Sequence, residues 1–114
     1  MPLYAVIAFD KPDTADLRER LRADHRAYGF ANDGPTRLAG ALYADDGSQC
    51  GTLKIFEADS AEDVWDWYRK EPFYLAGLYA DFKIVEWNLA FNRFPLKDWN
   101  LSAPGRIDRT QSAN

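Results

Sequence analysis

The chain contains a single histidine, His25, and its place on a predicted helix makes it the first candidate for proton transfer. Leu17, Leu21, His25 and Tyr28 follow one another at spacings of four, four and three, which puts them on one helix face. A neutral imidazole at the end of this stripe, flanked by Tyr28, can act as a general base near neutral pH. The alternative is a core histidine satisfied by one backbone carbonyl, and the pattern by itself favours that interpretation.

Glu71 is the candidate partner for this imidazole because of the proline that follows it. Pro72 disfavours helical geometry at the preceding residue, so we expect the second long helix to end near Lys70. A carboxylate at such a break can turn inward and orient an imidazole, as the acidic member of a catalytic triad does. The alternative is an exposed charge at a helix end.

Arg22 and Gly40 are candidates for substrate binding, together with Tyr28 beside the imidazole. Arg22 lies one turn before His25 and could hold an anionic group through paired hydrogen bonds. The alternative is a solvated arginine paired with Glu19 or Asp16. Gly40 interrupts a predicted strand, which weakens it, and leaves room either for a ligand or for a helix that approaches closely.

Several classes of site and partner are excluded by composition. One histidine and one cysteine, Cys50, are too few for a zinc site, and no nucleotide-binding loop motif is present, so we expect no metal and no cofactor. A net charge of −4 argues against nucleic-acid partners, and no apolar run is long enough to span a membrane. The N-terminus lacks the basic region of a signal peptide, so we expect a cytoplasmic protein.

The hydrophobic pattern predicts one α+β domain over residues 1–94, followed by a C-terminal extension, 95–114, that is partly docked and then flexible. The expected elements are strand 3–9, helix 15–28, strands 36–44 and 51–58, a helix from 61 to about 70, a short helical turn to Gly77 and strand 82–91. The order βαββαβ predicts a ferredoxin-like fold: a four-stranded antiparallel sheet with two helices on one face.

The other face of this sheet is expected to be apolar as well. The first strand is hydrophobic on both sides, and the last strand offers a second apolar row that includes Val85 and Trp87. Such a face is too hydrophobic to leave in water. A second copy of the chain can cover it with the same surface, so the sequence predicts a homodimer formed through the sheet faces.

Four segments in this order resemble the YCII-related (YciI-like) family. They are Arg22-Ala-Asp-His25, Arg37-Leu-Ala-Gly40, Gly51-Thr52, and Glu71-Pro72-Phe73 followed by Ala76-Gly77-Leu78-Tyr79-Ala80-Asp81. The resemblance spans residues 3–92 and implies a dimeric α/β barrel. It also implies an active site built on a histidine, matching His25, and on an acidic residue, matching Glu71. The family has aspartate at the acidic position, so this chain is longer there by one methylene.

Two functions follow as hypotheses. The first is a cofactor-independent enzyme of lyase or isomerase type, in which His25 moves a proton on a small anionic or hydroxylated cyclic compound. The second is a non-enzymatic dimer that binds a small ligand or serves as an accessory domain, with His25 and Glu71 as a structural pair.

Overall fold

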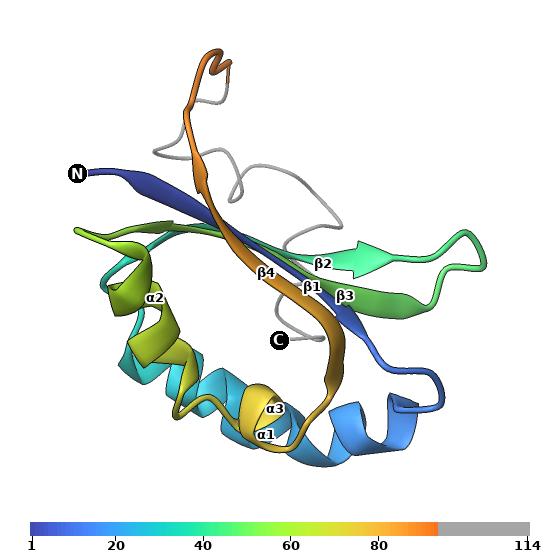
Figure 1. Cartoon of the computed structure of the whole chain (residues 1–114). Coiled ribbons are helices and arrows are strands. Elements are labelled where there is room, and N and C mark those ends of the chain that lie inside the picture. The colour runs from blue at the N-terminus through green and yellow to red at the C-terminus, as the bar shows by residue number, and fades with distance from the viewer. Residues whose placement is uncertain (94–114) are drawn as a thin grey trace.

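The computed structural model describes residues 1–93 and contains four strands and three helices in that range (Figure 1). The elements are β1 (Leu3–Asp10), α1 (Ala15–Ala31), β2 (Thr36–Tyr43), β3 (Gln49–Glu57), α2 (Ala61–Tyr68), α3 (Pro72–Leu75) and β4 (Tyr79–Trp87). The predicted docking and flexibility of residues 95–114 lie outside the described part.

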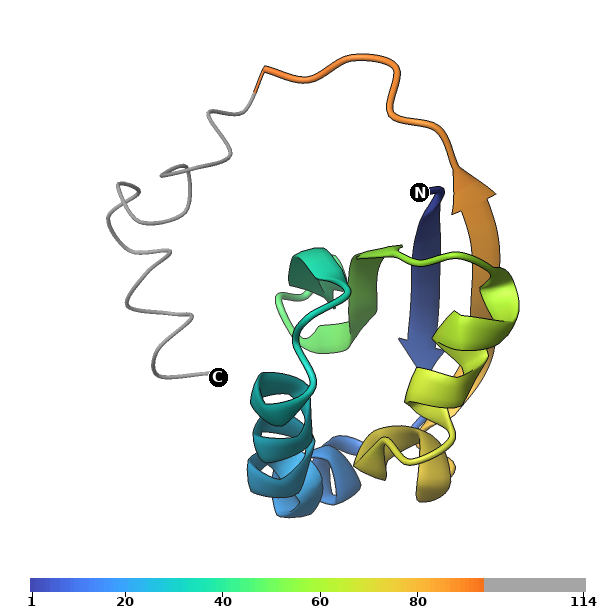
Figure 2. The ribbon, with the colours of Figure 1, turned by 90° about the vertical axis from the view of Figure 1, so that its left-hand side faces the viewer.

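The strands form one sheet in the order β2-β3-β1-β4, and every neighbouring pair is antiparallel. The three helices lie on one side of this sheet, with α1 beside α3 (Figures 1 and 2). This arrangement confirms the predicted ferredoxin-like fold. It also brings the second half of α1 close to the segment that joins α2 to α3.

The core lies between the sheet and the helices. Alternate residues of β1 and β3 point into it, among them Tyr4, Val6 and Phe56, and α2 contributes Val64 and Trp67. Because neighbouring residues of a strand point to opposite faces, the residues between them line the outer face of the sheet. Ser60 caps α2 by accepting a hydrogen bond from the backbone of Asp63, as its position predicts.

Two predicted boundaries are wrong. Helix α1 continues through Gly29 to Ala31, where the backbone and side chain of Asn32 both donate to the carbonyl of Tyr28 and so satisfy the helix end. Strand β4 begins at Tyr79 and ends at Trp87 instead of covering 82–91. Its span follows β1, whose first residue Leu3 pairs with Trp87 and leaves no partner beyond it.

Arg18 is a buried charged residue near the start of α1. Its guanidinium donates two hydrogen bonds to the carboxylate of Asp10, at 2.8 and 2.9 Å, and both side chains are buried. The pair connects the end of β1 to the first turns of α1. A paired charge of this kind can be buried because each partner satisfies the other.

None of the helices within residues 1–93 is long and apolar enough to cross a bilayer.

Gly51 is a position where the packing of β3 against β1 tolerates no side chain. A Cβ built there lies 2.1 Å from the backbone oxygen of Ala8. We expect Gly51→Ala to lower the free energy of unfolding by about 1–3 kcal/mol, because the strands must separate locally. Urea denaturation checks this. Gly40→Ala is the control, since a Cβ there meets nothing within 4 Å. Equal stability of the two variants would contradict the close approach.

Candidate active site

His25 and Glu71 are in direct contact. The distance from Nδ1 of His25 to Oε2 of Glu71 is 2.8 Å, although the residues are 46 positions apart. The predicted contact is therefore confirmed. The extra methylene of glutamate is accommodated without loss of this hydrogen bond.

Glu71 is fully buried, and its carboxylate is held in place by the start of α3. The backbone of Glu71 is extended, with φ −78° and ψ 129°, as the following proline requires. Its Oε2 accepts from the backbone of Phe73 at 2.7 Å, and its Oε1 from the backbone of Tyr74 at 3.3 Å. The hydroxyl of Tyr79 donates to Oε1 at 3.4 Å. Counting His25, four donors surround one buried carboxylate.

The geometry assigns the proton of the imidazole. An ionised carboxylate only accepts hydrogen bonds, so Nδ1 of His25 carries the proton that it donates to Glu71. Nε2 is then the basic nitrogen of the neutral ring. No residue within 1–93 bonds to Nε2, and no buried polar side-chain atom there lacks a partner. Nε2 therefore lies on the accessible 27 % of the side chain.

Phe73 fixes the plane of the imidazole. Its ring stacks on that of His25 with centroids 4.0 Å apart and planes inclined by 12°. The guanidinium carbon of Arg18 lies 4.8 Å from the centroid of the same Phe73 ring. Because Arg18 is bound to Asp10, the ion pair, the phenyl ring and the imidazole form one connected unit.

The negative charge of Glu71 influences several neighbours. Burial, and then this charge, raise the pKa values of Tyr28, Tyr68 and Tyr79, so the three phenols remain protonated at neutral pH. Tyr79 therefore remains a hydrogen-bond donor to Glu71. The site holds one anion among neutral hydroxyls.

Lys54 is a polar residue near this site that the sequence analysis did not single out. Burial lowers the pKa of its ammonium to about 8, and the charge of Glu71 opposes that lowering. The sequence does contain a feature that predicts its orientation: Lys54 lies two residues before Phe56 on a strand whose side chains alternate between the two faces. Since Phe56 belongs to the core, Lys54 had to point to the helix side too.

With this geometry described, the comparisons with known proteins place the chain. The sequence model of the YCII-related domain matches residues 2–88. The chain belongs to the YCII-related family. None of the curated proteins compared with it matches significantly.

A solved structure supports the same fold for this YCII-related protein. The 5-chloro-2-hydroxyhydroquinone dehydrochlorinase TftG from Burkholderia phenoliruptrix, in complex with 2,5-dihydroxybenzoquinone, is 26% identical, with a TM-score of 0.70 over 77% of this chain and 95% of that chain. The fold is thus that of the dimeric α/β barrel superfamily. Rv0793 from Mycobacterium tuberculosis is 15% identical, with a TM-score of 0.47 over 81% of this chain and 98% of that chain, too low a likeness to bear on function.

The structure of the YCII-related protein brings Tyr28 into the same neighbourhood as the pair. The hydroxyl of Tyr28 donates to the backbone oxygen of Trp67 at 2.5 Å, and the two rings meet edge-on, with centroids 4.8 Å apart. Tyr28 thus holds α1 against α2, and its role as a substrate contact stays a prediction.

Arg22 lies on α1 and pairs with Glu19 through Nη2 at 3.1 Å, which was the alternative weighed for it. It also lines a cleft of about 530 Å³ between the β1–α1 connection and the start of β3, with Arg18 and Cys50. A role for Arg22 in binding an anion stays a prediction.

Gly40 is not brought to the His25–Glu71 pair. It pairs with Leu53, which is on the outer face of the sheet, so β2 presents Gly40 away from the helices. The alternative explanation, a helix in close approach, is wrong, because a Cβ at this position has no neighbour within 4 Å.

Residues 1–93 contain no cluster of three or more side chains suited to hold a metal ion.

Replacing the buried carboxylate of Glu71 should cost stability. In Glu71→Gln an amide nitrogen must face N–H or O–H donors that the carboxylate now satisfies, so we expect the free energy of unfolding to fall by about 1–3 kcal/mol. Urea denaturation at neutral pH measures this. Glu86→Gln, at an exposed position, is the control, and it should change stability by less than about 0.5 kcal/mol. Identical losses in both variants would refute the role of the four hydrogen bonds.

Proposed function

We propose that this YCII-related protein is a cofactor-independent enzyme that moves a proton on a small hydroxylated or anionic cyclic compound. The observation that supports this most directly is that the two nitrogens of the His25 imidazole have different surroundings. Nδ1 is bound to a buried carboxylate, while Nε2 is accessible and has no protein partner among the described residues. A histidine required only for packing does not need a basic nitrogen on an accessible surface.

The proposed step uses His25 as base and Glu71 as the group that positions it. Nε2 takes a proton from an acidic C–H or O–H of the ring compound, and the resulting imidazolium is stabilised by the adjacent carboxylate. In a lyase, the electron pair left behind forms a double bond and expels an anion from the neighbouring carbon. In an isomerase, the imidazolium returns the proton to another atom of the same molecule.

The substrate class is supported by the similarity to TftG, whose name describes a dehydrochlorinase and whose structure contains 2,5-dihydroxybenzoquinone. Removal of hydrogen chloride is a lyase reaction of the kind described above. At 26% identity we carry over the reaction type and the compound class, a small hydroxylated ring, and leave the individual substrate open.

A second function has an observation in its favour. Three of the four hydrogen bonds to Glu71 come from its own structural surroundings, the start of α3 and Tyr79. A non-enzymatic ligand-binding domain would need the same capping arrangement. The two functions differ in whether bound ligand exchanges protons.

Proton transfer can be measured before the natural substrate is known. We expect the wild type to accelerate exchange of the ring hydrogens of 2,5-dihydroxybenzoquinone with D2O, followed by NMR. His25→Asn should lower this acceleration by about 100-fold or more, because the base is lost. The asparagine amide can still donate to Glu71 in place of Nδ1, so the fold is expected to survive.

The thermal unfolding temperature of His25→Asn, with and without the quinone, serves as the control for folding and binding. Binding by the wild type without any acceleration of exchange would favour the non-enzymatic function. Equal acceleration by wild type and His25→Asn would remove His25 from the mechanism.

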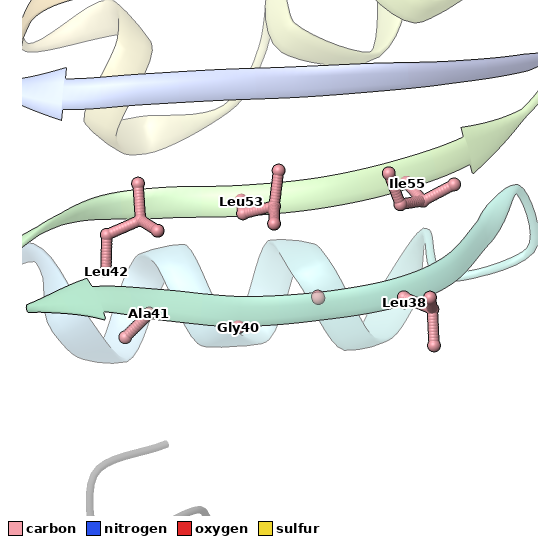
Figure 3. Close-up of a pocket in the computed structure, with 7 residues that line it drawn as sticks. Leu38, Gly40, Ala41, Leu42, Leu53 and Ile55 are labelled. Atoms are coloured by element: carbon pink, nitrogen blue, oxygen red, sulfur yellow. The ribbon is translucent and has the colours of Figure 1, made fainter. Parts of the chain in front are cut away.

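We also propose that two copies of the chain associate through the outer faces of their sheets. Phe9, Leu53 and Val85 are large apolar residues on this face, exposed by 42, 41 and 47 % respectively. Beside them β2 and β3 form a shallow apolar hollow of about 220 Å³ (Figure 3). Its lining includes Leu38, Gly40, Leu42, Leu53 and Ile55. An exposed apolar surface of this kind is typical of an interface between subunits.

Light scattering should give twice the chain mass of 13.0 kDa at micromolar concentration. Val85→Asp should convert this dimer to a monomer, because a carboxylate would be buried in the apolar interface without a partner. Phe30→Asp is the matched control: Phe30 is 68 % exposed but lies on α1, on the opposite side of the sheet. A wild type that is monodisperse at 13.0 kDa would refute the association.

A further inference from the structure

Lys54 is a buried cation without an anionic partner. Only 8 % of the residue is exposed, and no hydrogen bond or ion pair joins its ammonium to another of the residues 1–93. Its Nζ lies 4.1 Å from the ring centroid of Trp67, 5.4 Å from that of Phe56 and 6.0 Å from that of Tyr68. Lysine is rarely buried this deeply without a carboxylate to pair with.

The ammonium is nevertheless not sealed inside the core. Among residues 1–93, no buried polar side-chain atom lacks a hydrogen-bond partner. Because Nζ of Lys54 has no such partner, it must touch accessible surface. The ammonium can therefore be reached from solvent.

Lys54 points to the side of the sheet that holds the His25–Glu71 pair. It alternates with Phe56 on β3, and the helices cover that face (Figure 2). Trp67, which lies beneath the ammonium, packs against Tyr28, and Tyr28 follows His25 by one turn of α1. The negative charge of Glu71 acts on Lys54, and the carboxylate of Glu71 accepts a hydrogen bond from His25.

We propose that Lys54 binds an anionic oxygen of the ligand, a carboxylate or a phenolate, and so holds an aromatic or cyclic anion on the surface to which Nε2 of His25 is exposed. This inference rests on the proposed function and adds the residue that distinguishes an anionic ligand from a neutral one. The flat ring of Trp67 beside the ammonium suits a flat ligand.

Within residues 1–93, no anionic group is available to pair with Lys54. The two oxygens of Glu71 already receive four hydrogen bonds, which fills the lone pairs of a carboxylate. Tyr28 from α1 and Tyr68 from α2 have raised pKa values and remain neutral. With a pKa of about 8, most Lys54 side chains carry their proton at pH 7. The cation is therefore present and open to an anion from outside.

The test uses benzoate and benzamide, which have nearly the same shape but differ in charge. Titration by isothermal calorimetry at pH 7 should show that the wild type binds benzoate at least about 10-fold more tightly than benzamide. Lys54→Met should lose that preference, with benzamide affinity unchanged, and Lys54→Arg should retain it. Lys70→Met removes an exposed lysine and should behave as the wild type does.

The pH dependence of benzoate affinity tests whether Lys54 is the group that binds the carboxylate. Benzoate affinity should fall as pH rises through about 8 in the wild type and in His25→Asn, but not in Lys54→Arg. His25→Asn separates this titration from that of the imidazole, which faces the same region from α1. A fall that disappears in His25→Asn would overturn the assignment to Lys54.

Stability provides a readout that needs no ligand. Between pH 8 and 10.5 the unfolded chain holds a proton on Lys54 that the folded chain has lost, so stability rises with pH in this window. Lys54→Met should lack this rise and should unfold at a higher temperature than the wild type at pH 7. A variant that is less stable at pH 7 would contradict the buried, unpaired lysine.

The proposal fails if the wild type binds neither compound at millimolar concentration, binds both equally, or binds benzoate as well after Lys54→Met. These outcomes leave the proton-exchange test of His25 unaffected. Conversely, the wild type could fail to accelerate proton exchange while still binding benzoate more tightly than benzamide. That result would refute the catalytic function and leave the Lys54 binding site standing.

Discussion

The carboxylate of Glu71 is the point on which the described structure depends most. It is fully buried, and burying an ionised carboxylate is costly unless its lone pairs are occupied. Here the donors come from α1 through His25, from α3 through two backbone N–H groups, and from Tyr79 at the start of β4. One residue therefore fixes three elements relative to one another, and any shift of one element leaves a buried donor or acceptor unsatisfied.

The imidazole derives its properties from this constraint. With Nδ1 bound to Glu71 and the ring stacked on Phe73, Nε2 has a fixed direction. Arg18, Asp10 and Phe73 extend the support to the end of β1. Preorganisation of this kind is what proton transfer requires, since the base need not search for its orientation when a ligand arrives.

The two faces of the sheet have separate tasks. The helix side contains the aromatic core, the buried carboxylate and the unpaired Lys54, so it holds the polar chemistry in an environment of low polarity. The outer side contains exposed aliphatic and aromatic residues such as Leu53 and Val85, with Lys83 and Asp81 of β4 on the same face. The proposed association through the outer face would leave the helix side of each copy free for a ligand.

Much of the architecture is determined locally, and the sequence by itself was sufficient for it. The apolar run of β1, the helical spacing of Leu17, Leu21 and His25, and the break before Pro72 are properties of short segments, and they predicted the order of elements and the ferredoxin-like topology. The ends of α1 and β4 were placed wrongly for a physical reason. Where β4 stops depends on its partner β1, and where α1 stops depends on the bonds that Asn32 can make.

The site divides in the same way between sequence and tertiary structure. Helical spacing and Pro72 indicated that His25 and Glu71 could meet, but only the packing of α1 against α3 produced the 2.8 Å hydrogen bond and left Nε2 free. The burial of Arg18 was decided by tertiary structure, and for Lys54 the alternation of β3 determined only the face of the sheet on which it lies. The cost of burying a charge depends on which aromatic rings and carboxylates surround it, and those neighbours are distant in sequence.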